Sequence, residues 1–424
     1  MNIGFARTTI TPEGSVWLTG YGDRDHKSEG VYAPLHAGAV YLEGGVDRAL
    51  VITADVIGYS PPADATMRQA IADATGLLPR QVVLTATHTH CAPFFTPWNM
   101  PGAVEAEYAE FLQRKLRDVS LAAIHSAVTG RIEFSRASST FGVNRRLPDG
   151  AGSVTMAPNP DGSIDRDLDT LWLRTDSGEL LGTLTIYGCH PTSLSGYLIG
   201  PDYPGFLCRH VEADTGAPAL FATGCAGDVR PWFKRAGASG FLRPSLDELE
   251  AAGAGMAREV LSGRTTASTV EGDRLHIDHV NHRLPYADLP TREELLSEAD
   301  SEDPRARNWS RAMLQRLDAG GLADASPHEV QVLQLNPGFR VVFLGGEVLS
   351  EIGLHIKREL APATTINVAY ANGLIAYIPS ANAYPLGGYE VHGSHRYFLR
   401  PAAFTADCEA RIVETLGRLL ERLG

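Results

Sequence analysis

The chain has 424 residues, of which 44% are hydrophobic and 21% are charged, a composition typical of a water-soluble globular protein. Its formal net charge of −13 argues against a nucleic-acid partner, because a protein that binds phosphates needs a cationic surface. No stretch of about 18 consecutive apolar residues occurs, so the sequence predicts no membrane span. The length fits either one large elaborated domain or two domains.

The cysteines and the N-terminus bear on the cellular compartment. Five cysteines are scattered along the chain, and none forms a CxxC pair. This pattern favours free thiols in a reducing compartment over a disulfide framework. The N-terminal segment MNIGFARTTITPEG lacks the basic and then apolar pattern of a secretory signal. We therefore expect a cytoplasmic protein, and the sequence leaves homo-oligomerisation open.

The first elements in chain order are predicted to alternate between strand and helix. Residues 38–56 contain two β-rich runs around a Gly-Gly turn, the pattern of a hairpin. Residues 61–74 have apolar positions at helical spacing, and VVLTATHTH at 82–90 is typical of a buried strand. This order predicts an α/β protein.

The rest of the chain continues in the same way, and residues 380–404, rich in tyrosine and glycine, are typical of the wall of a site. The patterns predict further helices at 104–127, 205–216, 244–263, 291–318 and from 405 onward, and further strands within 131–142, 169–188, 217–231, 274–286 and 330–344.

Histidines follow two of the predicted strands. His88 and His90 lie two residues apart in LTATHTHCAP, so on a strand they would project from the same face. A second strand ends at His190 in YGCHP, and a third leads to Glu347 in LGGE. Two histidines and a carboxylate from separate strand ends are ligands of the kind that catalytic zinc uses. An isolated HxH is equally compatible with two histidines that only bond the backbone.

Other chemistry is less well supported. Cys91 and Cys189 adjoin the proposed histidines, but neighbours on an extended chain face opposite ways, so we expect packed thiols. The sequence contains no GxSxG nucleophile elbow, no HExxH zinc helix and no phosphate-binding GxxxxGK[ST] loop.

Several segments together resemble the neutral, non-lysosomal ceramidase family of zinc-dependent amide hydrolases. They occur in the family's order and cover most of the chain. The resemblance implies an α/β fold of mixed β-sheets flanked by helices, and one catalytic domain over residues 1–424 without the family's C-terminal β-sandwich. The matching segments are TPEG and LTGYG, ATHTH at 86–90, Asn144-Arg145, YGCHPTS at 187–193, PDYPGF at 201–206, GCAGDVRP at 224–231, GGE at 345–347, and NGLIAYIPS through GGYE at 372–390.

The resemblance also implies one zinc ion per chain and assigns its ligands. These are His88, His190, Glu347 and Tyr377. Tyrosine is not among the common zinc ligands, so Tyr377 rests on the resemblance, and a packed strand tyrosine is the alternative.

The family likeness implies cleavage of an amide C–N bond by hydroxide generated at the zinc. Catalytic roles fall on His90, Arg145 and Tyr389. Any of these three would stabilise the tetrahedral oxyanion, and His90 would also protonate the leaving amine.

The sequence departs from the family at GDVRPW, where the family has GDVSPN. Arg230 replaces a serine and Trp232 an asparagine, and both are expected to line the substrate pocket together with Tyr21. Arg230 either recognises a substrate carboxylate or phosphate or is a salt-bridged surface residue. Without a visible signal peptide, a small soluble amide is more plausible than ceramide.

Asp228, in the same segment, has two interpretations. It either orients a ligand histidine or caps a tight strand-to-helix turn, and the second is slightly favoured.

Two other functions stay open at this point. One is a binuclear metal amidohydrolase or lactonase on a TIM barrel, which would hold two metal ions. The other is a metal-stabilised binding protein without activity, which the replacement of the family serine by Arg230 keeps open.

Overall fold

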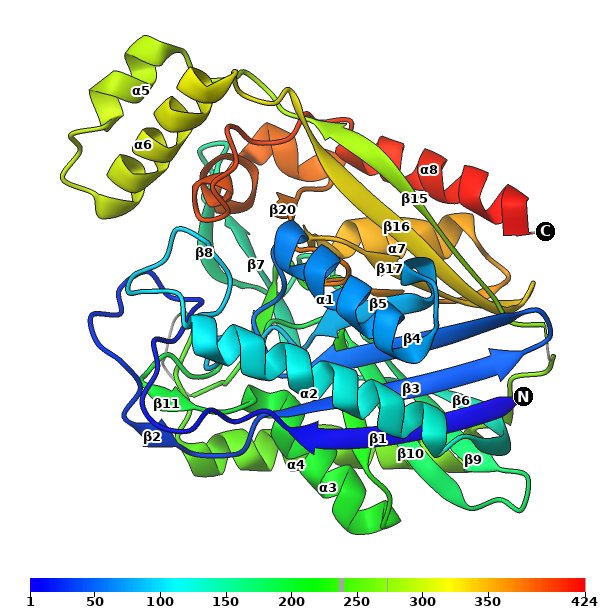
Figure 1. The fold of residues 1–424 in the computed structure, drawn as a ribbon. Helices are drawn as coiled ribbons and strands as arrows, with labels where there is room; N and C mark the ends of the chain where they lie inside the picture. The colour runs from blue at the N-terminus through cyan, green and yellow to red at the C-terminus, as the bar shows by residue number, and fades with distance from the viewer. Residues whose placement is uncertain (236–239, 273, 424) are drawn as a thin grey trace.

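The computed structural model describes residues 1–235, 240–272 and 274–423. Its largest sheet has nine strands in mixed orientation, in the order β12-β10-β9-β6-β1-β3-β4-β5, with β14 paired to β6 (Figure 1). The strands are β1 (Asn2–Thr9), β3 (His36–Gly44), β4 (Asp47–Ala54), β5 (Val82–Ala86), β6 (Val128–Ser138), β9 (Asp167–Thr175), β10 (Leu180–Tyr187), β12 (Ala219–Thr223) and β14 (Ser268–Thr269).

A second sheet packs against the inner face of the first. It has the order β15-β16-β17-β19, from β15 (His276–Pro285), β16 (Ala325–Asn336), β17 (Phe339–Leu344) and β19 (Thr364–Val368). Ile3 and Leu173 of the first sheet share one buried apolar cluster with Leu333 and Val341 of the second. Burial of this continuous interface is the main force that holds the two sheets together.

Helices cover the two outer faces, so the molecule is layered helix, sheet, sheet, helix. On the first sheet lie α1 (Pro61–Thr75), α2 (Ala106–His125), α3 (Asp202–Thr215) and α4 (Leu246–Gly263); on the second lie α7 (Ser350–Glu359) and α8 (Cys408–Leu423) (Figure 1). Mixed sheets flanked by helices confirm the predicted fold class, and the TIM-barrel alternative is wrong.

One predicted helix is divided. The stretch 291–318 forms α5 (Arg292–Glu298) and α6 (Pro304–Ala319), which pack as a helical hairpin beside the second sheet (Figure 1). The break comes where Asp303 caps α6 by accepting from Arg305 N, with Pro304 at its first position. Within the described residues, no helix is long and apolar enough to cross a membrane.

Short strands and turns at one end of the layers carry most of the polar residues discussed below. They are β2 (Gly30–Val31) with β11 (Leu198–Ile199), β13 (Val229–Pro231) with β7 (Gly142–Pro148) and β8 (Val154–Asn159), and β18 (Glu347–Val348) with β20 (Tyr377–Ile378). The 3-10 turns are 79–81, 264–266, 381–386 and 394–396, and residues 389–393 form a π-helical turn.

Three parallel strand pairs direct their carboxyl ends to this region. β5 runs parallel to β4, β12 to β10, and β19 to β17. Ala369 N donates to Thr223 O at 3.0 Å, and Ala371 forms a bridge with Thr85, which joins the ends of β19, β12 and β5. Carboxyl ends of parallel strands are where α/β proteins collect their ligands.

Candidate metal centre and active site

Three histidines meet where these strands end. His88 and His90 follow β5, and His190 follows β10. One ring nitrogen from each lies within 4.8 Å of the others, and His88 Nε2 is 3.3 Å from His90 Nε2. Imidazole nitrogens at this spacing can hold a metal ion.

The route by which His88 and His90 converge differs from the prediction. β5 ends at Ala86, and His88 has φ 66°, in the left-handed region. Its backbone N donates to Val56 O at 3.0 Å, which fixes the turn. The predicted strand over 82–90 is therefore too long, and strand alternation is not what brings the two rings together.

The backbone fixes the orientation of two of the rings. His88 Nδ1 lies 2.5 Å from Ile57 O, and His190 Nδ1 lies 2.5 Å from Ala226 O. A carbonyl oxygen only accepts, so each Nδ1 carries the proton and each Nε2 presents a lone pair. Ligand histidines in metal sites are typically oriented in this way. Both side chains are fully buried, so the lone pairs face the centre and not solvent.

Glu347 faces the same point from β18. Its Oε2 is 2.9 Å from His190 Nε2 and 3.4 Å from His88 Nε2. Burial raises the pKa of this carboxyl, so a positive charge close by is needed to keep it ionised. A buried carboxylate opposite two nitrogen lone pairs fits a divalent cation, because one ion satisfies all three groups.

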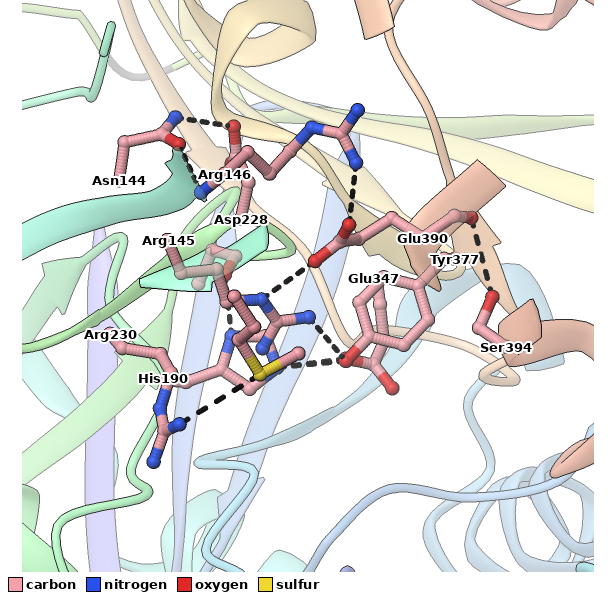
Figure 2. Close-up of polar contacts among 12 residues, drawn as sticks. Asn144, Arg145, Arg146, His190, Asp228, Arg230, Glu347, Tyr377, Glu390 and Ser394 are labelled. Atoms are coloured by element: carbon pink, nitrogen blue, oxygen red, sulfur yellow. Dashed lines mark hydrogen bonds and ion pairs between the residues drawn. The ribbon is translucent and has the colours of Figure 1, made fainter. Parts of the chain in front are cut away.

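Tyr377 completes the ring of polar groups. Tyr377 on β20 lies opposite Glu347 on the parallel strand β18. The hydroxyl oxygen of Tyr377 lies 3.3 Å from His190 Nε2. Arg145 Nη2 donates to the same hydroxyl at 3.1 Å (Figure 2). Burial raises the pKa of Tyr377, and Arg145 opposes this rise. The hydroxyl thus points at the histidines and not into the apolar core.

Arg145 belongs to a buried ion triad. Its Nε donates to Glu390 Oε1 at 2.8 Å, and Arg146 Nη1 donates to Glu390 Oε2 at 2.5 Å (Figure 2). All three side chains are at most 8% exposed, so the pairs lie in a low-dielectric interior. Glu390 was not singled out from the sequence. It holds Arg145 against Tyr377.

His90 and Tyr389 form the solvent side of the centre. His90 is half-buried, its ring centroid is 4.9 Å from that of Tyr21, and its Nδ1 has no partner among the described residues. Gly20 has φ 98°, and a Cβ there would lie 2.5 Å from His90 Nδ1. Glycine is therefore required at this contact. Tyr389 packs edge-on against Tyr377, with ring centroids 5.4 Å apart.

The two residues that depart from the ceramidase pattern have different surroundings. Arg230 is half-buried and its Nε donates to Thr192 Oγ1 at 3.2 Å, two residues beyond His190. Trp232 stacks under the ammonium of Lys234, at 3.8 Å from the ring centroid. None of the ring contacts between described residues joins Trp232 to the histidines.

Asp228 supports the start of α7 and does not contact a histidine side chain. Its Oδ1 accepts from Ser350 N at 2.8 Å, and its Oδ2 accepts from Asn144 Nδ2 at 2.9 Å. Asp228 therefore does not orient a ligand histidine, and it does not cap a helix of its own segment either, because β13 follows it; it binds the first residue of α7 instead. Its backbone oxygen also accepts from Arg145 N at 2.7 Å, which anchors the strand that carries the arginine.

Tyr370 is a second residue that the sequence analysis missed. It has φ 55°, its ring centroid lies 4.2 Å from that of His88, and its buried hydroxyl has no partner in the described structure. The only sequence signal is a tyrosine directly after the apolar strand β19. Tyr370 packs against the flat side of His88 and restricts the ring to its observed orientation.

The fold has counterparts among solved structures. The chain matches the crystal structure of the neutral ceramidase from Pseudomonas aeruginosa with a TM-score of 0.76 and 20% identity, over 99% of this chain and 74% of that one. A ceramidase complexed with C2 matches with a TM-score of 0.74 and 18% identity, over 99% of this chain and 75% of that one.

The chain has a neutral ceramidase-like fold. The sequence itself matches no protein-family model and no curated protein. At these identities the likeness to the neutral ceramidase concerns the architecture, and the chemistry has to be argued from the side chains.

Proposed function

We propose that the protein is a zinc-dependent amide hydrolase that binds one zinc ion per chain through His88, His190, Glu347 and Tyr377. The observation that carries the proposal is the convergence of two buried imidazoles, each with Nδ1 tied to a backbone carbonyl, on one carboxylate oxygen. Nitrogen and oxygen donors of this kind suit zinc. Bound there, zinc would activate a water molecule and polarise an amide carbonyl.

The group proposed to move the proton is His90. Its Nε2 lies 3.3 Å from the Nε2 of His88, so it borders the centre, and the residue is half-buried. A general acid has to reach the leaving nitrogen within hydrogen-bond distance. We assign His90 the transfer of a proton to the amine that leaves.

Tyr389 is the donor for the developing oxyanion. No hydrogen bond joins its hydroxyl to another described residue, and burial raises the pKa of this hydroxyl above its ordinary value, so it stays protonated at neutral pH. A free donor aimed at developing charge is typically the largest catalytic contribution.

Arg145 contributes differently from Tyr389. Its Nη2 and Nε are already bonded to Tyr377 and Glu390. We therefore assign it mainly the positioning of the Tyr377 hydroxyl, with its positive charge as a second stabiliser of the oxyanion.

The proposed substrate is an N-acyl compound smaller and more soluble than ceramide. Tyr21 and Tyr389 would line its path to the centre, since both are half-buried beside His90 or Tyr377.

We place the protein in the cytoplasm. All five cysteines are free, and four of them are buried, as expected in a reducing compartment.

The test combines metal analysis with a substrate screen. Purified protein should contain about one equivalent of zinc, and N-acyl amides of graded chain length should be hydrolysed only without a strong chelator. Activity that survives removal of all metal would overturn the proposal. Zinc-loaded protein that hydrolyses no amide would instead favour a metal-stabilised binding protein.

A further inference from the structure

Arg230 is a cation at the edge of the metal centre without a carboxylate partner. None of the ion pairs between described residues includes it. Its side-chain donors meet Thr192 Oγ1 at 3.2 Å, Thr192 O at 3.3 Å and the thioether of Met156 at 4.0 Å. The interpretation of Arg230 as a salt-bridged surface residue is therefore wrong.

The fold places Arg230 beside the catalytic groups. β13 pairs with β7 so that Arg230 stands opposite Val143, and cross-strand partners point to the same face of a sheet. Arg145 follows Val143 on β7, across an irregularity of the strand, and its charge acts on the guanidinium of Arg230, so the two arginines lie close together. Arg230 also leans on Thr192, which follows His190 by two residues. In the view of Figure 2, the guanidinium of Arg230 lies on the side of His190 away from Glu390.

A comparison with two other arginines shows what is unusual about Arg230. Arg145 has its charge balanced by Glu390. Arg24 has no carboxylate either, but it is 4% exposed and donates to three backbone carbonyls, those of Thr19, His90 and Gly196. Arg230 meets one carbonyl, and its Nη1 meets only a thioether, which is a weak acceptor.

The surroundings of Arg230 disfavour a bare charge. Burial lowers the pKa of this guanidinium, and nearby Arg145 lowers it further. Phe241 covers one face of the guanidinium, whose central carbon lies 4.6 Å from the centroid of the phenyl ring. A partly desolvated cation that lacks a counter-ion is costly, and an incoming anion relieves that cost. The Nη1 and Nη2 edge offers the parallel N–H groups that match a carboxylate.

We propose that the substrate is an N-acyl compound with a carboxylate close to the scissile amide, of the N-acyl amino acid type, and that Arg230 binds this carboxylate. The inference rests on the proposed amide hydrolase. It deepens that function by naming the group that distinguishes the substrate from ceramide, which carries no charge. A carboxylate is favoured over a phosphate because one uncompensated arginine balances one negative charge.

The experiment compares two substrates that differ only in this group. N-lauroylglycine and N-lauroylglycinamide have the same acyl chain and the same scissile bond, and N-lauroyl aminomethylphosphonate serves as the phosphate-like arm. We expect kcat/KM for the carboxylate to exceed that for the carboxamide by about tenfold to a hundredfold, as for a charged hydrogen-bonded pair. Arg230→Met should reduce this ratio to about one, and Arg230→Lys should keep part of it.

Arg117→Met is the matched control, since Arg117 is an exposed arginine on α2 that pairs with its neighbour Asp118. This variant should keep the wild-type ratio. Zinc content and circular dichroism establish that each variant is folded. An equal or inverted ratio in the wild-type protein, or a ratio that Arg230→Met leaves unchanged, would overturn the proposal. A preference for the phosphonate would replace the carboxylate by a phosphate group.

Failure of the hydrolase proposal gives a different result. If no amide is cleaved, calorimetric binding of N-lauroylglycine and N-lauroylglycinamide to the zinc-loaded protein still decides the role of Arg230. Tighter binding of the carboxylate that disappears in Arg230→Met supports anion recognition without catalysis. Equal binding of the two compounds would overturn it.

Discussion

Two groups of histidines in this molecule have nearly the same ring spacing but different chemistry. In the metal centre, the ring centroids of His88 and His90 are 4.9 Å apart. His282 and His328, directly opposite each other on β15 and β16, also have centroids 4.9 Å apart. In this second pair His282 Nε2 lies 2.7 Å from His328 Nδ1, a direct hydrogen bond between the rings.

The difference lies in what the ring nitrogens contact. At the centre, the Nδ1–H groups of His88 and His190 donate to backbone carbonyls, so both Nε2 lone pairs are left facing Glu347. In the His282–His328 pair one ring donates to the other, so a lone pair is consumed, and no described carboxylate pairs with either ring. Proximity of histidines is thus insufficient for a metal site. Backbone anchoring and a facing carboxylate are needed as well.

The largest effect is expected from substitutions in the metal centre, whereas a substitution in the His282–His328 pair should leave the zinc in place. His190→Gln or Glu347→Gln should reduce bound zinc from about one equivalent to less than about 0.1, and hydrolysis should fall by at least about 10³-fold, because ligand loss removes the activated water. The His328→Gln variant should still bind about one equivalent of zinc, because His328 is not a proposed ligand. Plasma mass spectrometry of the dialysed proteins measures the metal. Full zinc occupancy in both ligand variants would refute the ligand assignment.

A second variant tests whether the third histidine is a ligand or a proton donor. The nitrogens of His88, His90 and His190 all lie close enough to share one ion. If His90 moves the proton, His90→Gln should retain about one zinc and lose about 10²-fold in kcat. If the variant instead loses the metal, the ion is held by the three histidines, and the catalytic role passes to another group.

A smaller effect is expected from the ion triad behind the centre. Glu390→Gln keeps an acceptor for Arg145 but leaves two buried guanidiniums with no counter-ion. The free energy of unfolding should fall by about 3 kcal/mol, as when one partner of a buried pair is removed. The turnover number should fall about tenfold as Tyr377 loses its support.

Urea denaturation and kinetics on the same preparation separate these two effects. Glu414→Gln, an exposed glutamate on α8 that pairs with Arg418, is the control and should change neither quantity. If the turnover number of the Glu390→Gln variant is unchanged, the ion triad stabilises the fold but does not support Tyr377 in catalysis.

Much of the architecture was readable because it depends on local patterns. The hairpin of β3 and β4 and the helix α1 follow from a Gly-Gly turn and from apolar spacing, both visible in short windows. The strands that lead to His88, His190 and Glu347 were equally visible, because each is an apolar run that ends in a polar residue. That chemistry gathers at strand ends is a general property of α/β sheets.

The details of the centre depend on contacts that a sequence does not reveal. Glu390 bonds Arg145 across 245 positions, and Tyr370 reaches His88 only through the packing of β19 beside β12. The left-handed turn at His88 is stabilised by a bond to the backbone of Val56, which no propensity of histidine encodes. Long-range contacts therefore decided the geometry, and local patterns decided the elements.

The smallest expected effect concerns the pair and its response to pH. Burial lowers the pKa of His282 to about 4 and lowers the pKa of His328 as well. Both values are below the ordinary histidine pKa of about 6.5, so below that pH the unfolded chain binds more protons than the folded one. The stability that the neutral pair contributes is complete above about pH 6.5 and is lost as the pH falls toward about 4.

The double variant His282→Gln, His328→Gln should have a smaller slope of unfolding free energy against pH in this window. The decrease should correspond to at most about two bound protons. Urea titrations of the metal-free protein at a series of pH values measure that slope, and the exposed His125 at the end of α2 provides a substitution that should not change it. An unaltered slope in the double variant would mean that the pair is protonated in the folded protein. The bond between the rings would then have two donors and no acceptor, so the pair would be forced apart and the contrast with the metal centre would no longer hold.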